Sequence, residues 1–159
     1  MSVAKPDFRL GRIIYCYLLG RNGRREQHPA VIVSPDEEII QPERFDPRAA
    51  RGVIKDNLIA VLGISTKYGN FQDPYIQLPL GAQTQLTSDC AVILNWIATP
   101  AIPDDCEFLL GDLPPVLMVR INAEYRRLLK DVLSKVEGTL AETLNLLTRE
   151  RKRRSPRHR

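Results

Sequence analysis

Three short segments of this chain carry side chains that can take part in acid–base or phosphate chemistry. His28 is one of two histidines in the 159 residues, and an imidazole ring can accept or donate a proton near neutral pH. Arg24 and Arg25 precede it in a glycine-containing loop, and adjacent guanidinium groups suit phosphate binding. Ser65 and Thr66 follow an apolar run, where hydroxyl groups also commonly hydrogen-bond the backbone of a turn. These residue types indicate proton transfer and anion binding, with ordinary surface and turn roles as the alternative.

The chain lacks the residue patterns of a metal or disulfide site. Its three cysteines, Cys16, Cys90 and Cys106, form an odd set without CxxC spacing. The first two lie in apolar runs, where a thiol behaves as a small hydrophobe. No group of histidines with Asp or Glu shows the spacing of metal ligands. We therefore expect no metal, no cofactor and no structural disulfide.

Composition and the lengths of the apolar runs predict a globular protein of the cytoplasm. Hydrophobic residues make up 43% and charged residues 26%, close to the average of soluble globular domains. Every apolar run is shorter than the roughly 18 residues of a membrane span. The opening residues lack the apolar core of a signal peptide. The sequence thus predicts a cytoplasmic protein without a membrane segment.

The net charge of +4 is unevenly distributed along the chain. Residues 149–159 contain seven basic residues and one acid, so this segment carries +6 and residues 1–148 carry −2. Because like charges repel and almost nothing apolar is present, we expect residues 149–159 to form a disordered basic tail. Such a tail can add nonspecific affinity for nucleic acid.

Six short apolar or β-branched segments alternate with turn residues, a pattern typical of a closed or nearly closed small β-barrel. The segment 35–56 contains three prolines and has no sustained periodicity, so we expect a long surface loop there. The predicted barrel domain covers residues 8–113. Its strands are expected at 11–19, 28–34, 57–64, 75–78, 90–97 and 107–110.

The spacing of apolar residues changes to a helical period after the barrel. Asp112 is a candidate N-cap, and Pro114 and Pro115 stand where the first helical turn tolerates proline. Apolar residues then recur in steps of three and four on one face. We expect a long C-terminal helix over 114–148. The apolar face over 132–147 exceeds what a small barrel can bury, which predicts a partner for it.

Three groups of segments, taken in order, resemble the MazF/PemK (Kid) toxins of type II toxin–antitoxin pairs. Residues 11–15 and 28–34, GRIIY and HPAVIVS, are similar to that family's Gly-x-Ile/Val strand and its Arg-Pro-Ala-Val-Val-x-Ser. Residues 61–67 and 75–79, VLGISTK and YIQLP, resemble its strand that ends in a Thr or Ser turn and the strand that follows. Residues 86–99, LTSDCAVILNWIAT, resemble the segment in which Leu and Asp precede a buried strand ending in Gln-Ile-Arg-Thr.

The resemblance implies an SH3-like barrel that forms a homodimer, binds single-stranded RNA in a groove and is neutralised there by an antitoxin protein. It also implies RNA cleavage by attack of the ribose 2′-OH on the adjacent phosphodiester. That reaction needs proton transfer and stabilisation of charge on the phosphorane, and no metal. Carried onto this chain, the catalytic residues are His28, Ser65 and Arg25. The RNA-binding residues are Arg24, Thr66, Lys67, Trp96 and Thr99, and for Trp96 the alternative is core packing.

Two positions depart from the family's pattern. His28 stands where the family has the arginine of Arg-Pro, and Ala98 where it has the arginine of Ile-Arg-Thr. A histidine can perform proton transfer, and Arg24 or Arg25 can supply the fixed positive charge. The leading hypothesis is therefore a metal-independent endoribonuclease toxin. The alternative is a catalytically inactive SH3-like barrel that binds a protein or RNA.

Overall fold

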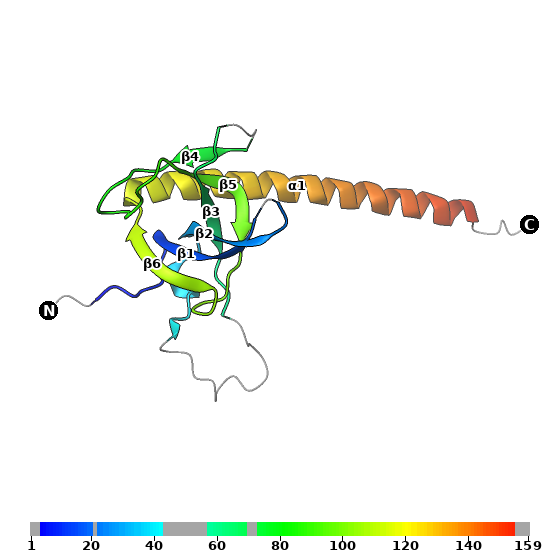
Figure 1. The fold of residues 1–159 in the computed structure, drawn as a ribbon. Coiled ribbons are helices and arrows are strands. Elements are labelled where there is room, and N and C mark those ends of the chain that lie inside the picture. The colour runs from blue at the N-terminus through cyan, green and yellow to red at the C-terminus, as the bar shows by residue number, and fades with distance from the viewer. Residues whose placement is uncertain (1–3, 21, 43–56, 70–72, 155–159) are drawn as a thin grey trace, which may run out of the picture. The chain divides into compact units, whose positions relative to one another are not determined.

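Six strands form one antiparallel sheet in the computed structural model, which describes residues 4–20, 22–42, 57–69 and 73–154. The order across the sheet is β4-β5-β3-β2-β1-β6, and each strand runs antiparallel to its neighbours (Figure 1). All six belong to the first of two compact units, Met1–Ala123. The strands are β1 (Arg12–Leu19), β2 (Arg25–Ile32), β3 (Val61–Ser65), β4 (Tyr75–Gln77), β5 (Ala91–Ala98) and β6 (Cys106–Asp112).

Alternation along the strands buries apolar side chains from both faces of the sheet. In β1, Ile14, Cys16 and Leu18 point to one side and join a core cluster that includes residues of β2, β3 and β5. Ile13 points to the other side and is also fully buried. Apolar runs such as that of β1 are expected where a strand is covered on both faces. The core cluster includes Trp96, whose ring contacts His28 on β2.

The sheet is not closed, because β4 and β6 are its two edges. The end of β6 nevertheless meets the segment that follows β4. The backbone N–H of Gly111 donates to the Thr84 carbonyl at 3.1 Å, and that of Asp112 donates to the Gln83 carbonyl at 3.0 Å. A Cβ atom at position 111 would lie 1.9 Å from the Gln83 carbonyl oxygen, so only glycine permits this approach. Two hydrogen bonds thus join β6 to the segment after β4, without a continuous ladder.

Several predicted boundaries differ from the observed ones. The strand expected at 28–34 begins at Arg25, because the β1–β2 hairpin pairs Leu19 with Arg25 and leaves only residues 20–24 in the connection. The strand expected at 57–64 forms only from Val61 onward. Within the loop expected at 35–56, the structure shows a short 3-10 helix, η1 (Asp36–Glu38), and residues 43–56 lie outside the described residues.

Helix α1 (Pro115–Arg154) has 40 residues and begins with proline at its first position, as proposed from the sequence. Asp112 does not cap it. The Asp112 carboxylate instead accepts hydrogen bonds from Arg9 Nε at 2.9 Å and Nη2 at 2.6 Å, at the end of β6. Met118 and Ile121, in the first turns of the helix, are buried within the first unit.

The second compact unit, Glu124–Arg159, contains the remainder of α1. The helix continues six residues beyond the predicted end at 148, since Arg, Lys and Glu have high helix propensity and local like charges do not stop it. Residues 155–159 lie outside the described residues. None of the helices in the described residues is long and apolar enough to cross a membrane. Apolar side chains exposed by 50 to 63% lie along this unit at Val132, Leu133, Val136, Leu140, Leu144, Leu146 and Leu147.

Candidate functional site

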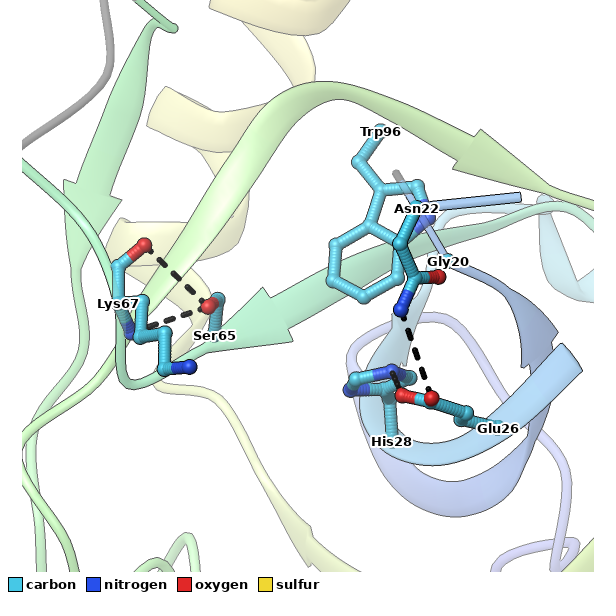
Figure 2. Close-up of a pocket in the computed structure, with 7 residues that line it drawn as sticks. All are labelled: Gly20, Asn22, Glu26, His28, Ser65, Lys67 and Trp96. Carbon is cyan, nitrogen blue, oxygen red and sulfur yellow. Dashed lines mark hydrogen bonds and ion pairs between the residues drawn. The ribbon is translucent and has the colours of Figure 1, made fainter. Parts of the chain in front are cut away.

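The pairing of β2 with β3 brings two predicted catalytic residues together. Ala30 pairs with Gly63 in that ladder, so the same register continued by two residues places His28 across from Ser65. Side chains two positions apart along a strand point to the same face. His28 and Ser65 line one cavity of about 210 Å³ with two further residues named from the sequence, Lys67 and Trp96. The cavity is also lined by Gly20, Asn22 and Glu26 (Figure 2).

His28 has an acidic neighbour in this cavity. Its Nε2 atom lies 3.7 Å from Oε2 of Glu26, within ion-pair distance. The side-chain amide of Asn22 donates a hydrogen bond to Oε1 of the same carboxylate at 3.4 Å (Figure 2). The His28 side chain is 28% exposed, so it is supported by neighbours and still open to solvent. An imidazole in this environment can exchange a proton with a bound molecule.

Trp96 supports the His28 ring from β5. The two ring centroids are 4.9 Å apart with an interplanar angle of 78°, an edge-to-face contact. The indole N–H donates to the Leu19 carbonyl at 3.1 Å, which fixes the ring between β1 and β2. The side chain is buried, as the core-packing alternative expects. A role of Trp96 in stacking on RNA stays a prediction.

Gly63 makes room for this tryptophan. A Cβ atom at position 63 would lie 2.2 Å from two carbons of the Trp96 ring, a separation that real side chains do not show. The glycine in VLGIS is therefore a packing requirement of the site. Its φ angle is not what selects it, since Gly63 is not among the residues with positive φ.

Ser65 has a structural task as well as a place in the cavity. Its Oγ accepts a hydrogen bond from the Lys67 backbone N–H at 3.0 Å and lies 3.3 Å from the Lys67 carbonyl, to which it donates (Figure 2). These bonds define a turn after β3 and place Lys67 at the cavity wall. Lys67 is the cationic side chain that lines the cavity.

Arg25 and Thr99 lie in a different cavity, of about 430 Å³, which also contains Ala98. Arg25 is three positions from His28 on β2, and an odd separation puts the two side chains on opposite faces. The Arg25 guanidinium is paired with the Asp105 carboxylate and lies over the Tyr17 ring, 5.7 Å from its centroid. The structure therefore does not bring Arg25 to the His28 cavity.

The last two predicted residues are also separated from His28. Thr66 lines a third cavity, of about 300 Å³, together with the stacked rings of Tyr15 and Phe108, whose centroids are 4.7 Å apart. Arg24 is exposed in the β1–β2 loop, where its backbone N–H donates to Asn22 Oδ1 at 2.9 Å. Arg24 lines none of these three cavities.

Glu26 and Asn22 belong to the His28 cavity and were missed from the sequence. The signal for Glu26 was its position two residues before His28, which places both on one face of a strand. Because the predicted strand began at residue 28, Glu26 lay outside it, and the rule for side chains on one face was not applied to Glu26. Asn22 lies in the Gly20–Gly23 turn and approaches Glu26 only because the hairpin folds back.

A second polar cluster lies around Asp89. The Tyr68 hydroxyl donates to Asp89 Oδ1 at 2.6 Å, and Gln77 Nε2 donates to the same oxygen at 2.9 Å. The bond from Tyr68, followed by that from Gln77, lowers the pKa of the Asp89 carboxyl. The same bond to Asp89 is the main cause that raises the pKa of Tyr68 to about 12. This cluster thus stabilises a charged carboxylate beside a neutral phenol.

The cysteines are free thiols in the described residues, and Cys16 is fully buried. Burial, and then the neighbouring Cys106 and Asp105, raise the pKa of Cys16 to about 12. A thiol with such a pKa is a poor nucleophile at neutral pH. Among the described residues, no group of three or more His, Cys, Asp or Glu side chains is arranged to hold a metal ion.

Comparison with known proteins identifies the fold. No family model matches the sequence, and no curated protein matches it significantly. The chain is similar to the solved structure of MazF (Form-I) from Deinococcus radiodurans, with a TM-score of 0.54 and 13% identity, over 79% of this chain and 99% of that chain. It is also similar to that of MazE-MazF (Form-II) from Deinococcus radiodurans, with a TM-score of 0.50 and 13% identity, over 79% and 97% of the two chains. Together with the six-stranded sheet, which is not closed, and helix α1, these similarities confirm the predicted fold, SH3-like and of the MazF type with a long C-terminal helix.

Proposed function

We propose that this chain is a metal-independent endoribonuclease toxin of a type II toxin–antitoxin pair, which cleaves single-stranded RNA by attack of a ribose 2′-OH. The observation that carries the proposal is the cavity shared by His28, Ser65 and Lys67 on a MazF fold. A fold hosts many functions, so the chemistry of the side chains in this cavity is the stronger support.

In the proposed reaction, His28 accepts the proton of the 2′-OH. The 2′-oxygen forms a bond to phosphorus, and the bond from phosphorus to the 5′-oxygen of the next nucleotide breaks. The leaving 5′-oxygen takes a proton from solvent, to which the cavity is open. The products are a 2′,3′-cyclic phosphate and a 5′-hydroxyl, so no water is consumed in this step.

The charge that builds up on the phosphorane needs a cation nearby. Arg25 was expected in this role from the sequence, but its guanidinium is paired with Asp105 on the other face of β2. Lys67 lines the His28 cavity and is positioned by the Ser65 turn. We assign the cation of the transition state to Lys67, and Arg25 and Thr99 to more distant contacts with RNA.

The test is RNA cleavage by purified protein in EDTA, with the 2′,3′-cyclic phosphate identified by mass spectrometry. His28→Ala is expected to lower the rate by about 100-fold or more, the scale of general acid–base catalysis. Lys67→Ala is expected to lower it more than Arg25→Ala, a matched removal of one positive charge from the opposite face. Full activity of His28→Ala, or activity only with added magnesium, would contradict the mechanism.

Two observations favour a second candidate function, a catalytically inactive barrel that binds a protein or RNA. Both hydrogen bonds of the Ser65 hydroxyl go to the backbone of Lys67, as in a structural turn. His28 and Ala98 also replace two arginines of the resembled pattern. RNA binding without cleavage, unaffected by His28→Ala, would support this second function.

The proposal includes two protein partners. The MazE-MazF structure is a complex, and we propose that a comparable antitoxin, encoded by a neighbouring reading frame, neutralises this chain. We also propose a homodimer, because the apolar side chains of the second unit are exposed and the resembled family dimerises. Co-purification with the neighbouring gene product tests the first, and a mass of twice 18.1 kDa by light scattering tests the second.

A further inference from the structure

We propose that Glu26 is a positioning residue, which holds the His28 imidazole through Nε2 and leaves Nδ1 to accept the 2′-OH proton. This inference rests on the proposed function, because it assigns a role within the same cavity. Neither the resemblance nor the similar structures assigns any role to Glu26.

Both side chains of the Glu26–His28 pair have a further neighbour in the cavity. Oε2 of Glu26 lies 3.7 Å from Nε2 of His28, and Asn22 Nδ2 donates to the other carboxylate oxygen at 3.4 Å. The carboxylate therefore lies between the amide of the hairpin loop and the imidazole (Figure 2). Trp96 contacts the His28 ring edge-to-face at 4.9 Å. Two groups from different strands, β2 and β5, thus lie next to the imidazole.

This arrangement has a chemical consequence for His28. A carboxylate next to Nε2 favours the tautomer that carries its proton on Nε2, which leaves the lone pair on Nδ1. The same carboxylate favours the imidazolium that forms once Nδ1 has accepted a proton. A separation of 3.7 Å is too long for a hydrogen bond, and such contacts commonly shorten when substrate binds.

The charged groups that face His28 in this cavity are Glu26, from its own strand, and Lys67, from the turn after β3. β5 contributes the uncharged Trp96. Lys67 attracts a phosphate by its positive charge, whereas the Glu26 carboxylate has the opposite effect. Glu26 is therefore expected to contribute to kcat and not to RNA affinity, since a carboxylate repels phosphate.

The test compares Glu26→Gln with wild type in RNA cleavage. Glutamine removes the charge and retains an oxygen that can accept from Asn22. We expect kcat to fall about ten-fold with KM unchanged or lower. Glu26→Asp, which retains the charge, should recover part of the loss. Glu107→Gln removes a carboxylate bonded to Gln27 and should leave kcat unchanged.

The outcomes separate this inference from the proposed function. Cleavage by wild type that is lost in His28→Ala but retained in full by Glu26→Gln would overturn the positioning role alone. A rise in KM at constant kcat would do the same, because it would indicate a binding role. Absence of cleavage by wild type would overturn both proposals. If Glu26→Gln does not fold, Asn22→Ala removes the 3.4 Å hydrogen bond to Glu26, together with the 2.9 Å bond from the Arg24 backbone N–H, and should lower kcat by a smaller factor.

Discussion

His28 shares its cavity with Glu26 and not with Arg25 because of the alternation of side chains along β2. Residues at even separation point to one face, and residues at odd separation point to opposite faces. The same rule separates Ser65 from Thr66, which line different cavities. Neighbours in sequence therefore have different surroundings, and the positive charge in the His28 cavity comes from Lys67.

The Tyr68–Asp89 hydrogen bond predicts how stability depends on pH. The pKa of Asp89 is lowered, so its stabilising contribution is present above the ordinary value of 3.8 and is lost as pH falls through the lowered value. The pKa of Tyr68 is raised from 10.0 to about 12, so its contribution is present below pH 10 and is lost as pH rises from 10 to 12.

Tyr68→Phe removes the hydroxyl, so it should lower the melting temperature at neutral pH. The difference from wild type should shrink at both extremes, below the ordinary pKa of Asp89 and above that of Tyr68. Thermal unfolding followed by circular dichroism across pH measures this. Tyr75→Phe is the control, because the Tyr75 ring contacts Tyr68 but is only a minor cause of the raised pKa of Tyr68; it should show a much weaker pH dependence. A constant difference for Tyr68→Phe at every pH would contradict the assignment.

At the scale of elements, the site depends on how closely β3 and β5 approach one another. Gly63 on β3 leaves the space that the Trp96 ring fills, and Trp96 in turn contacts His28 on β2. Three strands thus meet at one aromatic side chain. A substitution at Gly63 should therefore affect His28 through Trp96, without contacting His28 directly.

Gly63→Ala is expected to destabilise the protein by about 1 to 3 kcal/mol, because overpacking forces the tryptophan ring to move. The rate of RNA cleavage should fall as well, since Trp96 supports His28. Gly138→Ala is the matched control. A Cβ at that helical position meets nothing within 4 Å, so the change should stabilise by about 0.5 to 1 kcal/mol. Chemical denaturation measures both variants, and an unchanged midpoint for Gly63→Ala would refute the packing argument.

At the scale of the whole chain, positive charge is concentrated at the C-terminal end. Residues 149–154 extend helix α1, so several of the basic side chains expected in a disordered tail lie on a helix instead. Residues 149–159 carry +6, whereas residues 1–148 carry −2. Long-range attraction of RNA is therefore expected from this end, and the chemistry from the barrel.

Deletion of residues 149–159 should weaken RNA binding and make its salt dependence shallower. The slope of log K against log salt should fall by about 0.7 for each basic residue that contacts a phosphate of single-stranded RNA. The cleavage rate at saturating RNA should stay the same, because the His28 cavity is intact. Replacing Arg149, Arg151 and Arg153 by Gln keeps the chain length and gives an intermediate slope. An unchanged slope in both variants would show that this end does not contact RNA.

Much of the architecture was predictable because it follows from local patterns. The six strands and the helix appeared from apolar runs and from a change of period, which depend on residues close together in sequence. Strand ends were less accurate, as β2 and β3 show, because pairing with neighbours determines where a ladder stops. Four of the residues that the resemblance indicated line one cavity, and their roles stay predictions: His28, Ser65, Lys67 and Trp96.

The sequence by itself determined the residue types, the order of elements and the charge of the C-terminal end. Tertiary structure decided which charged groups act together. Arg25 pairs with Asp105, 80 positions away, and Glu26 meets His28 through a strand that begins earlier than predicted. Which side chains meet depends on the register of the strands, because a shift of one residue moves every side chain to the opposite face. Register is set by contacts between strands distant in sequence, which no local pattern contains.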